Sequence, residues 1–99
     1  MTNSGLAWLK EAVSDYKKLD GSQKVQVDKG LEKIKNDPYN AGKPLAGNLI
    51  MLREIKMKRL GLRITFMPTD EGPIVAEIIV IGKRSDDLAF KQAARRINL

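Results

Sequence analysis

The chain has 99 residues, a length that fits one domain, so we expect a single domain over residues 1–99. Eighteen Lys and Arg against twelve Asp and Glu give a net charge of +6, which predicts an anionic partner such as nucleic acid or an acidic protein. Cysteine and histidine are both absent. This excludes disulfides, thiolate metal sites and histidine acid–base catalysis, so Lys, Arg, Asp, Glu, Ser, Thr or Tyr must carry any chemistry.

The N-terminal residues lack a basic stretch followed by a long apolar run, and no window approaches the ~20 apolar residues of a membrane span. We therefore expect a cytoplasmic protein without a membrane partner.

The first part of the chain has the apolar spacing of a helix. Apolar residues recur every three or four positions, as Leu6, Leu9, Val13, Tyr16 and Leu19. This spacing predicts a helix that ends at Asp20-Gly21, although residues 6–9 also fit a short strand. The pattern alone leaves both alternatives open.

A second helix is predicted from Ser22, a suitable N-cap, to the break at Asp37-Pro38. Its buried stripe consists of Val27, Leu31 and Ile34. The two helices form a hairpin whose apolar faces require a partner layer.

The rest of the chain is predicted to form a loop, three strands and a final helix. Residues 36–48 contain Pro38, Gly42, Pro44 and Gly47 and predict a loop. Residues 49–58, 62–67 and 73–82 predict three antiparallel strands, the last of them the most buried. A helix capped by Ser85 follows, with Phe90, Ala93, Ala94 and Ile97 on one face. The predicted fold class is α+β.

Alternation along the strands places charge on one sheet face. Glu54, Lys56 and Lys58 share a parity, and Arg63 in the next strand falls opposite Lys56 or Lys58 if the two pair as a hairpin. Like charges opposite one another are destabilising, so an anionic ligand explains such a cluster better than a structural role does. The phosphate-binding hypothesis comprises Lys56, Lys58, Arg63, Lys83 and Arg84. The alternative is that these cations are ordinary solvated strand ends.

Several segments together resemble a known family. They are Gly42-Lys43-Pro44-Leu45-Ala46-Gly47-Asn48-Leu49, Arg53-Glu54-Ile55-Lys56, Gly61-Leu62-Arg63-Ile64 and Ile81-Gly82-Lys83-Arg84 before a helix. In order and spacing they are similar to the RelE/ParE superfamily of toxin–antitoxin toxins, closest to the RelE branch. The resemblance implies a short first strand, an N-terminal helical hairpin packed on a curved antiparallel sheet of three to four strands, and a C-terminal helix.

The resemblance also implies a function. Toxins of the RelE branch cut messenger RNA in the ribosomal A site by attack of a 2′-hydroxyl on the adjacent phosphate, and a cognate antitoxin protein silences them. No metal and no cofactor is implied, because cations can balance the charge of the phosphate. Lys56 falls on the family's lysine for the 2′-hydroxyl, Arg63 on its phosphate-binding arginine and Arg84 on the arginine near the leaving oxygen. Lys58 and Lys83 would add RNA contacts.

Two positions depart from the best-known family pattern. Glu54 stands where that pattern has another lysine, and it could act as a general base or hold Lys56 or Arg63 through an ion pair. Phe90 stands where that pattern has a tyrosine. Its ring can stack on a base, but its place on the apolar stripe of the last helix favours packing in the core. The alternatives to a ribonuclease are a ParE-like inhibitor of DNA gyrase and a catalytically inactive relative that binds an antitoxin.

Overall fold

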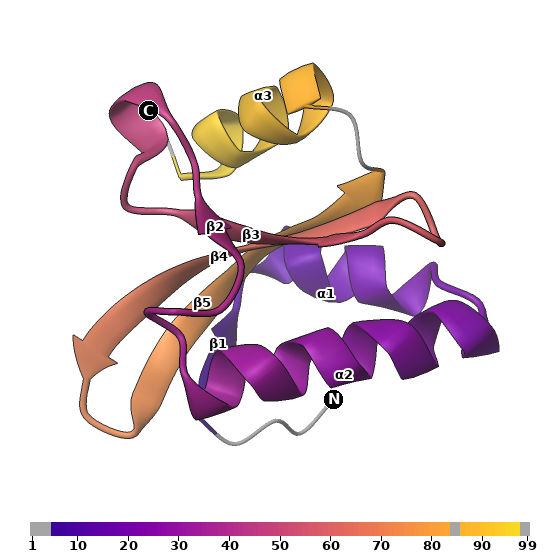
Figure 1. The fold of residues 1–99 in the computed structure, drawn as a ribbon, viewed down its shortest axis with the longest axis horizontal. Coiled ribbons are helices and arrows are strands. Elements are labelled where there is room, and N and C mark those ends of the chain that lie inside the picture. The colour runs from indigo at the N-terminus through magenta and orange to yellow at the C-terminus, as the bar shows by residue number, and fades with distance from the viewer. Residues whose placement is uncertain (1–4, 84–85, 98–99) are drawn as a thin grey trace.

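A sheet with helices on both faces makes up the computed structural model, which describes residues 5–83 and 86–97, without the side chains of Asn48 and residues 86–90. Helices α1 and α2 cover one face of the sheet, and α3 covers the other (Figure 1). The elements in chain order are β1 (Leu6–Trp8), α1 (Lys10–Lys17), α2 (Gly21–Asn36), β2 (Lys43–Pro44), a 3-10 helix (Gly47–Leu49), β3 (Arg53–Met57), β4 (Leu62–Glu71), β5 (Ile74–Lys83) and α3 (Asp86–Arg96). This arrangement confirms the predicted α+β class.

The sheet has five strands in the order β1-β5-β4-β3-β2. The β3–β4 and β4–β5 pairs are antiparallel, as the short connections predicted. The sheet has one strand more than the three to four predicted for an antiparallel sheet, because β1 pairs with β5 in parallel at one edge and β2 adds a short antiparallel strand at the other. A two-residue strand such as β2 carries no alternation, so no pattern could reveal it.

Residues 6–8 form a strand, which decides between the two alternatives left open by the pattern. The β strands that follow the helices also differ in extent from their predicted ranges. Residues 49–52 were predicted as the start of a strand, but a 3-10 helix and a turn occupy this stretch before β3 begins at Arg53. Leu49 and Leu52 are nevertheless fully buried. Buried apolar residues in a turn give the sequence the same apolar pattern as a strand, which explains the wrong prediction.

Asp20, not Ser22, is the N-cap of α2. Its Oδ1 accepts a hydrogen bond from the Gln23 backbone N–H at 2.8 Å, and Gln23 Oε1 accepts one from the Asp20 N–H at 3.0 Å. The Ser22 hydroxyl donates to the same Asp20 oxygen at 3.0 Å. The prediction of Ser22 as the cap is wrong because Asp20 both follows the first helix and satisfies the first free N–H groups of the second.

The larger core lies between the helical hairpin and the sheet. It contains the predicted stripe of α2 together with alternate residues of β4 and β5, among them Leu62, Ile64, Phe66, Ala76 and Ile78. Helix α2 approaches β4 closely at Gly30, where an added Cβ would lie 2.8 Å from Ile64 Cδ1. Any larger residue at position 30 therefore requires the helix or Ile64 to move.

A second core lies under α3 on the opposite face of the sheet. It comprises Leu49, Leu52, Ile79, Val80 and Ala93, with Ala94 and Ile97 packed against it. Strand β5 thus contributes apolar side chains to both cores, which confirms that it is buried on both faces. The β4–β5 register shifts between Thr65 and Phe66, leaving Ile79 without a partner in β4. Within the residues described, no helix is long and apolar enough to span a membrane.

Candidate functional site

Strands β3 and β4 bring Lys56 and Arg63 directly opposite one another. Ile55 and Met57 alternate with Lys56 and pack in the larger core, so Lys56 and Arg63 share the face away from the helical hairpin. The predicted hairpin is confirmed, and of the two lysines that it could have placed opposite Arg63, Lys56 and Lys58, the observed register selects Lys56. Gly82 of β5 is the next residue in the row beside Arg63, and it adds no side chain there.

Glu54 forms ion pairs with both cations of this cluster. Its Oε2 lies 2.6 Å from Arg63 Nη1, and its Oε1 lies 3.8 Å from Lys56 Nζ. Glu54 is 8% exposed and Arg63 only 3%, whereas the Lys56 side chain is 40% exposed. The cluster therefore presents a lysine to solvent above a buried arginine–carboxylate pair, in which the carboxylate offsets the desolvation of the guanidinium.

The other predicted site residues do not all join this cluster. Lys58 is exposed but lies in the turn after β3. Lys83 is exposed and pairs with Leu62, so the register places it on the side of the helical hairpin, away from Lys56 and Arg63. Arg84 and the side chain of Phe90 lie outside the described residues, and their predicted roles stay predictions.

A cavity of about 370 Å³ lies beside the cluster. It is lined by Lys33, Gly42, Lys43, Glu54, Ile55, Lys56 and Lys58. Lys33 and Lys43 were not among the site residues predicted from the sequence. Lys43 belongs to a segment that carries the family resemblance, which could have drawn attention to it, but nothing in the spacing of α2 indicates that Lys33 reaches the edge of β3.

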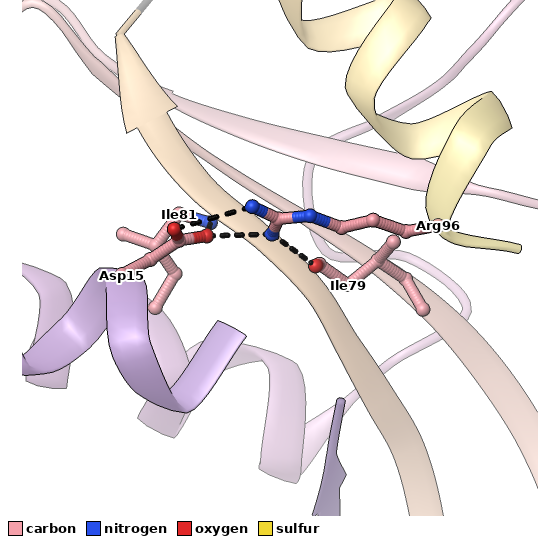
Figure 2. A network of polar contacts seen from close by, with 4 residues as sticks. All are labelled: Asp15, Ile79, Ile81 and Arg96. Atoms are coloured by element: carbon pink, nitrogen blue, oxygen red, sulfur yellow. Dashed lines mark hydrogen bonds and ion pairs between the residues drawn. The ribbon is translucent and has the colours of Figure 1, made fainter. Parts of the chain in front are cut away.

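A second polar network was also missed, at the opposite edge of the sheet (Figure 2). Arg96 of α3 donates to both carboxylate oxygens of Asp15 in α1, at 2.7 Å and 3.3 Å, and to the Ile79 carbonyl at 2.9 Å. Asp15 Oδ2 also accepts a hydrogen bond from the Ile81 backbone N–H at 3.0 Å. The network is structural, because it satisfies backbone groups of β5 beyond the end of β1.

Three aromatic side chains, those of Trp8, Tyr16 and Tyr39, hold neighbouring segments together. Trp8 and Tyr16 pack edge to face with ring centroids 5.8 Å apart. Partial burial, and then the hydrogen bond from its hydroxyl to Asp28, raise the pKa of Tyr16. The hydroxyl of Tyr39 donates a hydrogen bond to Asp70 at 2.8 Å, which raises the pKa of Tyr39. The same bond ties the loop after α2 to the end of β4.

Among the residues described, no group of three or more Asp or Glu side chains could hold a metal ion. The exposed Lys56 opposite Arg63 offers positive charge to an anionic ligand. No family model matches the chain.

Comparison with known proteins identifies several RelE proteins that are similar to this chain. An Escherichia coli protein named as a RelE-like toxin is 28% identical over 87 residues, which cover 88% of this chain and 90% of that protein. An arginine-to-alanine double mutant of the E. coli toxin RelE in the free state matches with a TM-score of 0.76 and 24% identity, covering 95% of this chain and 97% of that one.

Two toxin–antitoxin complexes show the same similarity. The intact E. coli RelBE complex matches with a TM-score of 0.72 and 24% identity, covering 83% of this chain and 98% of that one. A RelBE complex from Mycobacterium tuberculosis matches with a TM-score of 0.67 and 20% identity, covering 82% and 98%. The chain therefore has the fold of the RelE toxins, and its predicted resemblance to the RelE branch of the RelE/ParE superfamily is confirmed.

Proposed function

We propose that the chain is the toxin of a type II toxin–antitoxin system and that it cuts messenger RNA on the ribosome. The observation that carries this proposal is the cluster of Lys56, Glu54 and Arg63 on one face of a RelE-like sheet, with Lys56 opposite Arg63. The similarity in sequence to a RelE-like toxin supports it. Messenger RNA supplies the anionic partner that a net charge of +6 favours.

The proposed reaction is attack by a ribose 2′-hydroxyl on the adjacent phosphate. The new bond closes a 2′,3′-cyclic phosphate while the bond to the 5′-oxygen breaks, so one proton leaves the 2′-hydroxyl and one reaches the leaving oxygen. We assign Lys56 to the 2′-hydroxyl, Arg63 to the charge that develops on the phosphate, and Arg84 to the leaving oxygen. No step of this assignment requires a metal.

Glu54 is a positioning residue in this proposal. One of its oxygens faces Arg63 and the other faces Lys56, which holds the two cations side by side before RNA binds. Because Arg63 is buried against Glu54, a phosphate reaches the guanidinium only by replacing this carboxylate as its anionic partner. Such an exchange keeps the charge of Arg63 compensated throughout.

The partners follow from the same proposal. Relatives with this fold include RelE proteins in complex with the antitoxin RelB, so we propose that a cognate antitoxin binds this chain. An acidic or amphipathic segment would suit a protein of charge +6. The ribosome supplies the messenger, and Lys58, which is exposed beside Lys56, contacts RNA phosphates.

The test compares three variants in a bacterium that lacks the antitoxin. After induction of the wild type, Lys56→Gln, Arg84→Ala and the control Lys29→Gln, new 5′ ends of messengers are mapped by primer extension. Lys56 and Lys29 are both exposed, so each substitution removes one surface charge and leaves the fold intact. We expect cuts in frame with codons for the wild type and Lys29→Gln, and their loss for the other two variants.

Two other outcomes of this experiment would point to a different function of the chain. Growth arrest with intact messengers would reject the ribonuclease and favour a target such as DNA gyrase. Antitoxin binding without arrest or cleavage would identify an inactive relative, an alternative that the burial of Arg63 against Glu54 favours.

A further inference from the structure

The cavity beside Lys56 gathers positive charge from three separate parts of the chain. Lys33 comes from α2, Lys43 from β2 and Lys58 from the turn after β3. These three lysines form no ion pair with any residue in the described part of the chain. Converging cations repel one another unless an anion lies between them, so the cavity is suited to an anionic ligand.

One wall of this cavity is held in place by backbone contacts. Arg53 donates from Nε to the Ala41 carbonyl at 2.8 Å and from Nη2 to the Gly42 carbonyl at 2.9 Å. Gly42 has a positive φ of 65° and lies so close to β3 that an added Cβ would overlap the Glu54 carbonyl oxygen. The loop that carries Lys43 is therefore fixed against the edge of β3 before any ligand binds.

The cavity is continuous with the proposed cleavage site. Glu54 and Lys56 line it, so an RNA strand that presents a phosphate to Lys56 passes over or into the cavity. A second hollow, of about 390 Å³, shares Lys58 and adds Arg59, which extends the basic surface along the turn after β3. An RNA backbone carries a regular row of phosphates and matches such a row of cations.

We propose that this cavity is a binding subsite for the RNA strand next to the scissile phosphate, in which Lys33 and Lys43 each contact a backbone phosphate. The inference rests on the proposed function, because it takes the ligand at Lys56 to be RNA. It adds two residues, Lys33 and Lys43, that hold the substrate without touching the reacting atoms.

The test measures binding in the absence of cleavage. A short 2′-O-methyl RNA cannot be cut by 2′-hydroxyl attack, and its binding is followed by fluorescence anisotropy from about 50 to 200 mM salt. The double variant Lys33→Gln/Lys43→Gln should reduce the slope of log K against log salt by about 1.4, or about 0.7 for each lost phosphate contact. The control Lys10→Gln/Lys29→Gln removes the same charge from exposed positions that line neither cavity and should change the slope far less.

Equal slopes in the two double variants would overturn the subsite, as would a wild type that does not bind the oligonucleotide at 50 mM salt. Unchanged RNA binding combined with weaker binding of an acidic peptide would also overturn it, in favour of a protein-binding surface. A slope loss confined to Lys33→Gln/Lys43→Gln, in a protein that cuts no messenger in cells, would retain the subsite and reject the nuclease. The two proposals thus fail separately.

Discussion

Glu54 lies between a buried arginine and an exposed lysine, and its surroundings favour a positioning role over a role as general base. A general base must approach the proton it removes, but both oxygens of Glu54 face cations and the residue is almost fully buried. The short contact with Arg63 also explains how an arginine can be buried in a small protein.

We expect Glu54→Gln to lower the free energy of unfolding by about 2 kcal/mol, because the amide keeps the shape but removes the charge that compensates Arg63. Urea denaturation measures this change. Glu77→Gln is the matched control, because Glu77 is a partly buried carboxylate of the same sheet that forms no ion pair with a residue in the described part of the chain. This substitution should change the free energy of unfolding by less than about 0.5 kcal/mol. Equal effects of the two substitutions would contradict the role assigned to the Glu54–Arg63 pair.

Helix α2 depends on Asp20 at its start, and this dependence varies with pH. The hydrogen bond from the Gln23 backbone, and then the one from the Ser22 side chain, lower the pKa of Asp20 below its ordinary value of 3.8. A carboxylate with a lowered pKa contributes stability that is complete above its unfolded pKa and is lost as the pH falls through the folded pKa.

Asp20→Ala should therefore lower the melting temperature at pH 7, and the advantage of the wild type over this variant should shrink as the pH falls from about 5 to about 2. Asp20→Asn keeps an oxygen acceptor that does not titrate, so its advantage over Asp20→Ala should persist across the same range. Thermal unfolding followed by circular dichroism measures all three proteins. A pH-independent gap between the wild type and Asp20→Ala would show that the charge of Asp20 does not support the cap.

Elements with a regular pattern could be predicted from the sequence, and short or irregular ones could not. The apolar stripe of α2 and the alternation of β3 and β4 each specify a face, which is why Arg63 was correctly predicted to share a face with Lys56, although Lys58 was left open as its neighbour. Strand β2 and the irregular pairing at Ile79 have no such periodicity. The N-cap at Asp20 was missed because Asp20 was predicted only to end the first helix, whereas it also begins the second.

Alternation along the strands predicted which side chains of the candidate site share a face, but not which of them are in contact. Parity could not indicate that Glu54 contacts Arg63 at 2.6 Å, because alternation gives the face of a side chain and not its partner. Lys83 was grouped with Arg63 because it follows Gly82 at the end of a strand, whereas the observed register places Lys83 opposite Leu62. Lys33 approaches the site only through the packing of α2 against the sheet, which a single sequence does not encode as a local pattern.

At the scale of the whole molecule, the ion pair between Asp15 and Arg96 joins the two helical layers. Helix α1 lies on one face of the sheet and α3 on the other, and β1 ends at Trp8, before Ile79 and Ile81 of β5 (Figures 1 and 2). Asp15 and Arg96 meet past this end, and together they bond the Ile81 N–H and the Ile79 carbonyl. Their side chains are 16% and 11% exposed, so solvent screens the pair less than it screens an ordinary surface ion pair.

The Asp15–Arg96 pair should therefore fix α3 on the sheet. In a double-mutant cycle of Asp15→Asn and Arg96→Gln, we expect a coupling energy of about 2 kcal/mol, because two charge-assisted hydrogen bonds link the side chains. Amide hydrogen exchange in Arg96→Gln should accelerate in α3 while α2 keeps its protection, since the core between α2 and the sheet does not include Arg96. Arg95→Gln removes the neighbouring exposed charge and should leave both measurements close to wild type. A coupling energy near zero, or equal loss of protection in Arg95→Gln, would mean that apolar packing through Ala93, Ala94 and Ile97 alone holds the helix in place.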